Sequence, residues 1–379
     1  MYMSNKFFSE IKKNFGFGCM RFPMKGEEVD LEELSKMVDC FIENGFNYFD
    51  TAKPYIGGRS EPALKAALVD RYPRDAYILV DKLTSSQFEK EEEILPLFEL
   101  QLERCGVDYF DFYLMHSMNK AFFEKYKKCH AFEIAFDLKK QGKVKHVGMS
   151  FHDSAEVLEE ILTTYPEVEC VQLQFNYADY EDKAIQARRC YEVCEKHGKP
   201  VIVMEPVKGG ALANLPEDAR VPLDELGDGN SSASYAIRYA AGFDNIMMVL
   251  SGMSDMAQME DNVKHMKDFK PLDEREMAAV NKVCEILKTY ETVPCTACRY
   301  CVDGCPQNIL IPDLFADYNI TKSKLGGGGD WYYMIHTMQG GKASDCVKCG
   351  ACEDICPQHL KIRDLLEDVA ATFEKKEEK

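Results

Sequence analysis

Two cysteine runs with the same spacing constrain this chain of 379 residues more than any other feature of its sequence. The first run reads Cys295-x2-Cys298-x2-Cys301-x3-Cys305-Pro306, and the second reads Cys346-x2-Cys349-x2-Cys352-x3-Cys356-Pro357. They hold eight of the 16 cysteines, and the other eight are scattered over the first 285 residues. Thiols at such short, repeated intervals converge on shared centres, so the C-terminal part is predicted to fold around metal.

The repeated spacing favours two [4Fe–4S] clusters over zinc sites or disulfides. Two-residue spacers let three successive thiolates reach one cubane, while the fourth cysteine, before proline, points to the other cluster. Zinc does not require the doubled pattern, and disulfides are rare in a reducing compartment. The segment resembles a dicluster ferredoxin domain, with 40 residues between the two runs. The first cluster is assigned to Cys295, Cys298, Cys301 and Cys356, and the second to Cys346, Cys349, Cys352 and Cys305.

Short apolar segments alternate with amphipathic helical patterns upstream of the cysteine runs. Eight segments rich in Val, Ile, Phe and Tyr predict strands at 15–20, 47–49, 77–80, 110–115, 146–149, 170–175, 201–204 and 246–250. This alternation predicts an α/β fold and favours a (β/α)8 TIM barrel, with a doubly wound open sheet as the alternative. Polar residues that end several of these segments favour the barrel, where such ends share one face: Asp50, Lys82, His116, Ser150, Asn176, Glu205 and Ser251.

The domain organisation follows from these patterns. Residues 1–285 are predicted to form the barrel, and residues 286–379 a C-terminal ferredoxin-like iron–sulfur domain. Within the second domain, four glycines at 326–329 precede three aromatic residues. Consecutive glycines disfavour helix and strand, so 326–333 is predicted to be a mobile loop. It is interpreted either as a surface excursion or as a flap that covers a cluster or the barrel mouth.

Four residues of the first domain have the chemistry of a proton-donor assembly: Asp50, Tyr55, Lys82 and His116. A tyrosine with an ordinary pKa of about 10 is a weak acid at neutral pH. The ammonium of Lys82 is expected to lower that pKa, and the carboxylate of Asp50 to hold the lysine in place. His116 can hydrogen-bond a substrate carbonyl oxygen and orient it. The four together therefore predict a catalytic site, although each alone is as well explained by structure.

The surrounding motifs resemble the aldo-keto reductase family over roughly residues 14–265. The first signature is Phe49-Asp50-Thr51-Ala52-x2-Tyr55-x-Gly57-x-Arg59-Ser60-Glu61, and Lys82 and His116 stand where the family has its other catalytic residues. The resemblance implies a nicotinamide cofactor across the carboxyl face of the barrel, with Tyr55 as general acid. It also implies a set of cofactor-binding residues: Gly18, Met20, Asp50, Ser150, Gln172, Met204, Pro206, Lys208, Gly209, Ser251, Gly252, Met253, Gln258 and Asn262.

Two departures from the family pattern bear on the cofactor. Met204 stands where many members stack an aromatic ring on the nicotinamide, so the stacking surface would be a flexible thioether. Gln258 stands where an arginine is expected for the 2′-phosphate, and arginine is the better phosphate ligand. NADP is favoured on family grounds, with NAD as the alternative.

The expected activity is reduction of an aldehyde or ketone, or oxidation of an alcohol, on a small-molecule substrate. Hydride transfer moves two electrons and each cluster passes one, so the clusters are interpreted as structural or redox-sensing. Two alternatives remain open. In one, a ferredoxin-type partner sends electrons through the clusters to the barrel; in the other, the barrel is a non-catalytic redox sensor.

Charge and the N-terminal sequence limit the expected partners and location. The net charge is −18, which argues against binding nucleic acid or an anionic membrane. The first 14 residues lack an apolar segment and a cleavage site, and no apolar run is long enough for a membrane span. We therefore expect a cytoplasmic protein.

Overall fold

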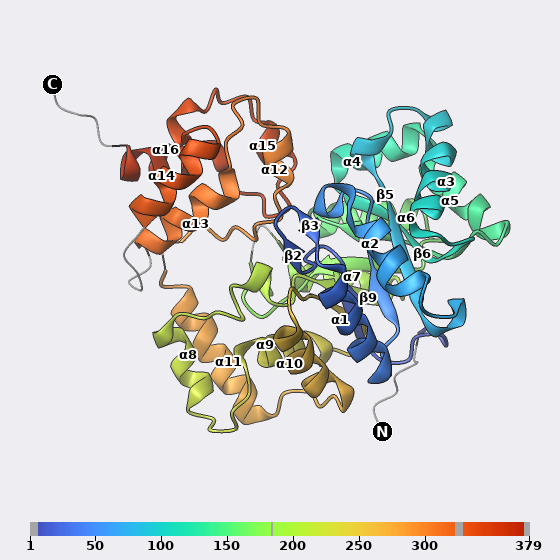
Figure 1. The fold of residues 1–379 in the computed structure, drawn as a ribbon, viewed down its shortest axis with the longest axis horizontal. Helices are drawn as coiled ribbons and strands as arrows, with labels where there is room; N and C mark the ends of the chain where they lie inside the picture. The colour runs from blue at the N-terminus through green and yellow to red at the C-terminus, as the bar shows by residue number, and fades with distance from the viewer. Residues whose placement is uncertain (1–6, 183–184, 291, 323–328, 375–379) are drawn as a thin grey trace. The chain divides into compact units, whose positions relative to one another are not determined.

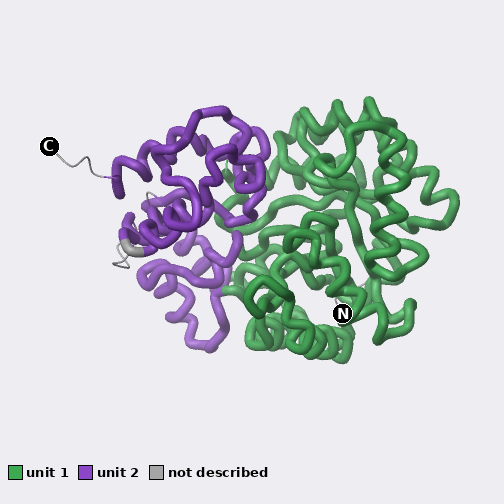
Figure 2. Tube along the Cα trace, turned by 45° about the horizontal axis from the view of Figure 1, so that its top comes forward, with its two compact units in different colours: residues 1–207, 233–274 green, residues 208–232, 275–379 purple. Residues whose placement is uncertain are grey.

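The computed structural model describes residues 7–182, 185–290, 292–322 and 329–374. Its contacts divide the chain into two compact units (Figure 2). Unit 1 comprises Met1–Val207 and Ala233–Glu274, and unit 2 comprises Lys208–Ser232 and Arg275–Lys379. The boundary at residue 285 that the sequence suggests for two domains stays a prediction.

Unit 1 contains a closed barrel of eight parallel strands (Figure 1). The ring order is β1-β10-β9-β8-β7-β6-β5-β4, closed by pairing of β1 with β4. The predicted (β/α)8 fold is therefore confirmed, and the open sheet is excluded. The strands are β1 (Phe15–Gly18), β4 (Tyr48–Asp50), β5 (Ile78–Thr84), β6 (Phe110–Met118), β7 (Val144–Phe151), β8 (Cys170–Gln174), β9 (Val201–Met204) and β10 (Ile246–Gly252).

Helices follow the strands as the amphipathic patterns predict. In α1, Asp30 caps the first turn by accepting from the Glu33 amide, and the apolar residues of one face are buried. A short hairpin, β2 (Met24–Lys25) with β3 (Glu28–Val29), precedes it. The helices are α1 (Leu31–Glu43), α2 (Ser60–Leu64), α3 (Ile94–Cys105), α4 (Lys120–Lys128), α5 (Ala131–Lys140), α6 (Ala155–Thr164), α7 (Ala187–Lys196), α9 (Ser232–Ala241) and α10 (Met256–Lys267).

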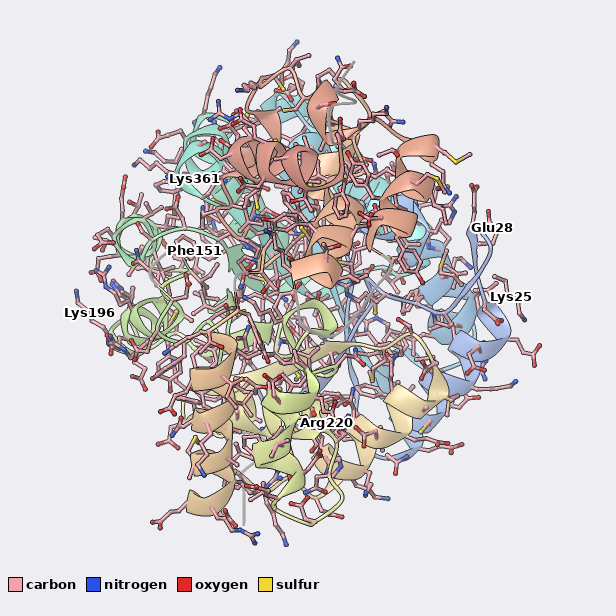
Figure 3. All side chains as sticks on the ribbon, turned by 90° about the vertical axis from the view of Figure 1, so that its left-hand side faces the viewer. Lys25, Glu28, Phe151, Lys196, Arg220 and Lys361 are labelled. Atoms are coloured by element: carbon pink, nitrogen blue, oxygen red, sulfur yellow. The ribbon has the colours of Figure 1, made fainter. Side chains whose placement is uncertain are left out.

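Apolar side chains fill the amino-terminal part of the barrel. They form one cluster that includes Tyr48, Val80, Leu114 and Met248. Figure 3 shows the opposite pattern at the surface, where labelled charged side chains such as Lys25 and Lys196 project outward and are exposed, whereas Phe151 is buried. No helix in the described part of the chain combines the length and apolarity that a membrane span requires.

Unit 2 is helical and has its own core. Its helices are α8 (Glu217–Asp224), α11 (Glu274–Leu287, from Arg275 on), α12 (Tyr300–Asp303), α13 (Ile311–Lys322), α14 (Gly329–Gln339), α15 (Ala351–Asp354) and α16 (Ile362–Phe373). A core cluster including Ile309, Phe315 and Leu366 is buried, and five of the eight cysteines of the two runs pack against it half-buried.

The loop predicted for 326–333 is wrong in its second half. Gly329 to Tyr333 belong to the helix α14, while 326–328 lie outside the described residues. The ring of Tyr333 stacks on Phe373 at 4.6 Å between centroids, and its hydroxyl accepts from the Ala343 amide at 3.0 Å. Burying this aromatic ring stabilises the helix by more than the roughly 1 kcal/mol that a terminal glycine costs.

Candidate functional site

The carboxyl end of the barrel interior is lined by polar side chains. Inward-facing positions alternate along a strand. On β4, β5 and β6 the apolar cluster ends, and the next inward positions are Asp50, Lys82 and His116. β7 and β8 contribute Ser150 and Gln172, and all five side chains are buried. The barrel thus brings these strand-end residues into one layer.

Lys82 is the centre of this layer. Its Nζ pairs with Asp50 Oδ1, donates to the Thr51 carbonyl at 2.8 Å and lies 3.2 Å from the Tyr55 hydroxyl. The side chains of Lys82 and Asp50 are 0% and 4% exposed, so this is a buried ion pair. Such a pair is favourable only when further hydrogen bonds satisfy both ions. Thr51 does so for the ammonium, and Gln172 Nε2 donates to the carboxylate at 3.3 Å.

Tyr55 reaches the layer from the turn that follows β4. The turn Tyr55–Gly58 contains left-handed residues, Ile56 with φ 54° and Gly57 with φ 60°. The Tyr55 amide donates to the Ala52 carbonyl at 3.0 Å, which holds the turn against the strand end. Glycine adopts the left-handed conformation readily, and this turn directs the side chain of Tyr55 back toward the barrel.

His116 lies beside Tyr55 at the end of β6. The two rings meet edge to face, with centroids 5.8 Å apart. His116 Nδ1 is hydrogen-bonded to the Thr84 hydroxyl at 2.7 Å. All four predicted catalytic residues therefore meet in one place.

Burial dominates the protonation of these groups. It raises the pKa of Tyr55 well above the ordinary value, and the charge of Asp50 raises it further. The net pKa of Tyr55 is therefore raised, because burial disfavours the phenolate more than a nearby ammonium can favour it; that Lys82 by itself lowers this pKa stays a prediction. Burial also raises the pKa of Asp50, against the effect of Lys82. Burial and then Lys82 lower the pKa of His116 well below its usual range, so at neutral pH the imidazole and the phenol are both uncharged.

Two glycines lie side by side at the carboxyl ends of β1 and β10. Gly18 and Gly252 are partners in the register of β1 and β10. A Cβ on Gly18 would lie 3.3 Å from the backbone of Ser251 and Gly252, and a Cβ on Gly252 would lie 3.2 Å from the Arg21 side chain. Packing within the protein therefore favours glycine at both positions, and their contact with a dinucleotide stays a prediction.

Other residues predicted to bind the cofactor are engaged within unit 1. Ser150 Oγ accepts from the Ser117 amide at 2.8 Å, and Gln172 is bonded to Asp50 as described above. Met20 and Met204 are half-buried, and Pro206 is buried. These positions follow strands β1 and β9 at the carboxyl end, as the sequence predicts. Their contact with a nicotinamide stays a prediction.

The start of α10 is occupied by a capping network. Asp255 accepts from the Gln258 amide at 2.8 Å and from Gln258 Nε2 at 3.0 Å, while Gln258 Oε1 accepts from the Ser254 amide at 3.0 Å. Behind it, Asn262 Nδ2 donates to Ser251 Oγ at 3.1 Å, and Met253 is fully buried. The helix therefore presents a carboxylate and an amide at its first turn.

Lys208 and Gly209, two more residues predicted to bind the cofactor, belong to unit 2. Both residues have positive φ, 48° for Lys208 and 65° for Gly209. A Cβ on Gly209 would lie 2.4 Å from the carbonyl oxygen of Thr296, the residue after Cys295. Glycine is therefore required where this loop packs on the backbone of the first cysteine run.

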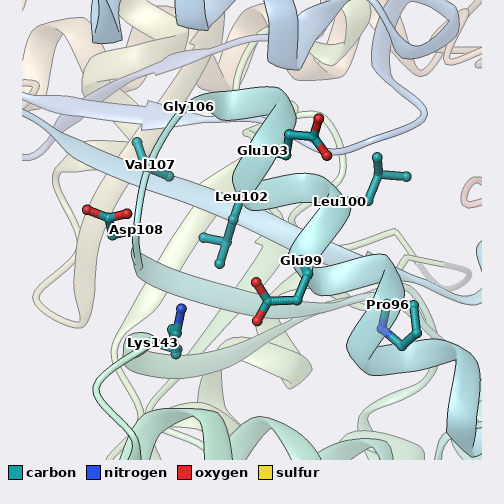
Figure 4. Close-up of a pocket in the computed structure, with 9 residues that line it drawn as sticks. All are labelled: Pro96, Glu99, Leu100, Leu102, Glu103, Gly106, Val107, Asp108 and Lys143. Atoms are coloured by element: carbon teal, nitrogen blue, oxygen red, sulfur yellow. The ribbon is translucent and has the colours of Figure 1, made fainter.

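A surface pocket in unit 1 lies away from this chemistry (Figure 4). It is lined by the end of α3 and by residues just before β6 and β7, among them Glu103, Asp108 and Lys143. These are the amino ends of the strands, whereas Asp50, Lys82 and His116 stand at the carboxyl ends. In a barrel the two faces serve different roles, so this pocket is not part of the candidate site.

The eight cysteines of the two runs fall into two groups. One cavity is lined by Cys305, Cys346, Cys349 and Cys352. In the other group, Cys301 interacts electrostatically with Cys298, Cys295 and Cys356. Each group takes three thiols from one run and the last from the other run, as the spacing predicts. Four convergent thiols are the donor set that a [4Fe–4S] cluster takes, so the residues fit the predicted groups.

Three neighbours of the catalytic layer are absent from the sequence prediction. Thr84 bonds His116, Arg21 packs on Gly252, and the Cys19 amide donates to the Asp50 carbonyl at 2.8 Å. Thr84 lies two residues after Lys82 on the same strand, so the alternation of strand side chains contains the signal for it. Arg21 and Cys19 lie after β1 and carry no comparable signal.

The fold and the motifs agree with the comparisons made with known proteins. The model of the aldo/keto reductase family matches residues 14–285, and that of the 4Fe-4S dicluster domain matches residues 294–360. The chain belongs to the aldo/keto reductase family, and its C-terminal part contains a 4Fe-4S dicluster domain. It is thereby an NAD(P)-dependent oxidoreductase of the aldo-keto reductase type.

Individual relatives are similar over parts of their length. An NADPH-dependent alpha-keto amide reductase of Saccharomyces cerevisiae is 29% identical over 192 residues, covering 48% of this chain and 58% of that protein. An NADH-specific methylglyoxal reductase of Escherichia coli is 26% identical over 196 residues, covering 46% and 57%. The solved structure of an aldo-keto reductase from Bacillus halodurans, in its holo form, matches with a TM-score of 0.58 and 24% identity over 71% of this chain and 91% of that one. That structural likeness concerns the fold.

Proposed function

We propose that the chain reduces the carbonyl group of a small aldehyde or ketone, or oxidises the corresponding alcohol, with Tyr55 as the general acid or base. One observation carries the proposal. The Tyr55 hydroxyl lies 3.2 Å from Lys82 Nζ, beside the ring of a neutral His116, in a buried layer at the carboxyl end of the barrel. A bound reduced nicotinamide supplies the hydride.

The proton comes from the protein. A neutral Tyr55 carries its hydroxyl proton at neutral pH and can give it to the substrate oxygen as charge develops there. The phenolate left behind faces the ammonium of Lys82, whose charge Asp50 balances. Because burial raises its pKa, Tyr55 stays protonated at neutral pH, and Lys82 stabilises the phenolate that forms after the proton transfer.

His116 orients the carbonyl group. The proposal assigns the tautomer in which Nδ1 accepts from the Thr84 hydroxyl and Nε2 carries the ring proton, so that the Nε2–H group can donate a hydrogen bond to the substrate oxygen. A neutral imidazole is suited to this task, because a cationic ring beside Lys82 would be strongly disfavoured.

The cofactor is proposed to be NADP or NAD, held by Gly18 and Gly252 and by the predicted residues beyond them. The start of α10 bears on the choice. A 2′-phosphate bound there would meet the Asp255 carboxylate and the amide of Gln258, with no guanidinium from position 258. We expect NADH to be used at least as well as NADPH, which departs from the preference that family resemblance suggests. Among the relatives, one enzyme is NADPH-dependent and the other NADH-specific.

We also propose that unit 2 holds two [4Fe–4S] clusters, one ligated by Cys295, Cys298, Cys301 and Cys356 and the other by Cys346, Cys349, Cys352 and Cys305. The proposal is supported by the two sets of four cysteines, each of which brings its thiols together in unit 2. Their role is proposed to be structural or redox-sensing. A ferredoxin-type partner and a cytoplasmic location stay predictions.

Replacement of Tyr55 by Phe tests the catalytic proposal. Turnover of a carbonyl substrate should fall by roughly a hundredfold or more, while binding of the nicotinamide, measured by fluorescence titration, should persist. Tyr48→Phe is the matched control, because Tyr48 is a buried tyrosine of the same barrel whose hydroxyl has no hydrogen-bond partner among the described residues. Undiminished turnover in Tyr55→Phe would exclude Tyr55 as the acid.

A further inference from the structure

A second buried polar group lies on the outer face of β5, behind Lys82. Asp81 points away from the barrel interior toward Glu61 of α2 and Cys105 of α3. All three side chains are fully buried, and one polar atom of each lies within 4.8 Å of the others. Arg104 pairs with Glu61 Oε2 from the same side. The proposed reaction uses none of these groups.

The buried oxygens of this group cannot all be hydrogen-bonded if both carboxyls are ionised. Asp81 Oδ1 accepts from the Lys82 amide at 2.7 Å, and Oδ2 faces the Cys105 thiol at 3.8 Å. Glu61 Oε2 takes Arg104, but the buried Glu61 Oε1 has no donor. Its neighbour is Asp81, and a carboxylate oxygen of each residue lies within 4.8 Å of the other. Ionised carboxylates are acceptors only, so a hydrogen bond between the two can form only if one of them carries a proton.

We propose that Asp81 is protonated and donates to Glu61 Oε1, and that this proton-sharing pair positions Lys82 for the reaction. The positioning part rests on the proposed function of Lys82. The proton belongs to Asp81 because Arg104 stabilises the negative charge on Glu61. A single shared proton satisfies every buried oxygen of the pair.

The charged and titratable groups around Asp81 support this assignment. They are Glu61 from α2, Arg104 and Cys105 from α3, Tyr113 from β6 and Lys82 in β5 itself. Burial, followed by the charge of Glu61, raises the pKa of Asp81 well above its ordinary value. The side chain of Lys82 leaves the opposite face of the strand, where it pairs with Asp50.

The link to Lys82 runs through its own peptide group. Its amide donates to Asp81 Oδ1, and its carbonyl accepts from Gln101 Nε2 at 2.9 Å. Gln101 is fixed in turn by the Tyr113 hydroxyl at 2.7 Å. The backbone is thus held on both sides, so the pair behind the strand determines where the ammonium stands in front of it.

The test compares Asp81→Asn, Asp81→Ala and wild type in the full-length holo-protein. Asparagine reproduces the protonated acid, since its Nδ2 donates to Glu61 and its Oδ1 accepts from Lys82. It should keep kcat/KM within about twofold, whereas alanine should lower it roughly tenfold or more. The infrared difference spectrum between wild type and Asp81→Asn at neutral pH should contain the carbonyl band of a protonated carboxyl, which shifts in D2O.

Asp111→Asn is the matched control for the spectrum. Asp111 is a buried aspartate of the neighbouring strand that pairs with Arg74 and Lys145, so its variant should show no such band. Absence of the band for Asp81, or equal loss of turnover in both Asp81 variants, would overturn the proposal. A divalent ion bound in wild type and lost in Asp81→Asn would overturn it too. The band reports the proton whatever the role of Tyr55, so its failure and that of the proposed reaction are distinguishable.

Discussion

Replacement of Lys82 by Met should show how much the barrel depends on its buried ion pair. Methionine keeps the length of the side chain and removes the ammonium. Asp50 would keep the Gln172 hydrogen bond at 3.3 Å as its remaining side-chain partner, in a position where its side chain is 4% exposed. Removal of one partner of a buried pair destabilises a protein by about 3–5 kcal/mol. We expect a loss of that size in the free energy of unfolding near pH 8.

The loss should depend on pH, with a sign that the structure fixes. Burial already raises the pKa of Asp50 above its ordinary 3.8, and removal of Lys82 takes away the positive charge that opposes this rise most strongly. A carboxyl whose pKa is higher in the folded than in the unfolded state favours folding below the unfolded pKa. That advantage disappears as pH rises through the folded pKa, by at most about 1.4 kcal/mol per pH unit for one proton. The difference in the free energy of unfolding between Lys82→Met and wild type should therefore become smaller as the pH is lowered from 8 to 5.5.

Urea unfolding followed by circular dichroism measures this gap at each pH. Asp50→Asn/Lys82→Met should recover most of the stability, because no buried charge remains, yet it should not recover turnover. Lys145→Met is the matched control, since Lys145 is 45% exposed and its partner Asp111 keeps Arg74. Its cost should stay below about 1 kcal/mol. A pH-independent gap, or wild-type stability of Lys82→Met at pH 8, would refute the reasoning.

Two further predictions concern the clusters and the cofactor. Cys356→Ala removes a proposed ligand of the first cluster, so the iron content should fall from about eight to about four per chain. Cys284→Ala is the control, because Cys284 lies outside both runs and its replacement should leave the iron content unchanged. An unaltered iron content in Cys356→Ala would contradict the ligand assignment. Gln258→Arg should raise kcat/KM for NADPH relative to NADH by roughly tenfold through a guanidinium at the start of α10. Gln258→Ala controls for the lost bonds to Asp255 and Ser254, and an unchanged ratio in the arginine variant would place the 2′-phosphate elsewhere.

The barrel was predictable because its strands are short apolar segments separated by polar helical patterns. β9 at Val201–Met204 coincides with its predicted range. The helix α4 buries only Phe123 and Tyr126 among its lysines, so its sequence carries too weak a periodic signal to predict a helix there. α14 was missed because the local preference of glycine was weighed without the packing of Tyr333.

The four residues of the catalytic layer could be proposed because each follows or ends a predicted strand. Their protonation could not, since the pKa of Tyr55 depends on how deeply the fold buries it. The pairing of Glu61 with Asp81 was out of reach for a related reason. The strand period places Asp81 on the face opposite Lys82, but which helix covers that face is decided by tertiary packing.

The proposed clusters would have a structural role in unit 2 that needs no part in the reaction. Its core is small, and Cys295, Cys305, Cys346, Cys352 and Cys356 pack against it half-buried. Each proposed ligand set joins one run to the last cysteine of the other, so metal binding ties together segments that lie about fifty residues apart in the chain. Because metal ligation contributes directly to folding energy in small domains, cluster assembly would stabilise this unit. Its loop at Gly209 packs on the backbone of Thr296, next to Cys295. Loss of the first cluster would therefore disturb the loop at Gly209, which precedes the cysteine runs by more than eighty residues. In this way a cluster could report the redox state through the conformation of unit 2, without passing electrons to a substrate.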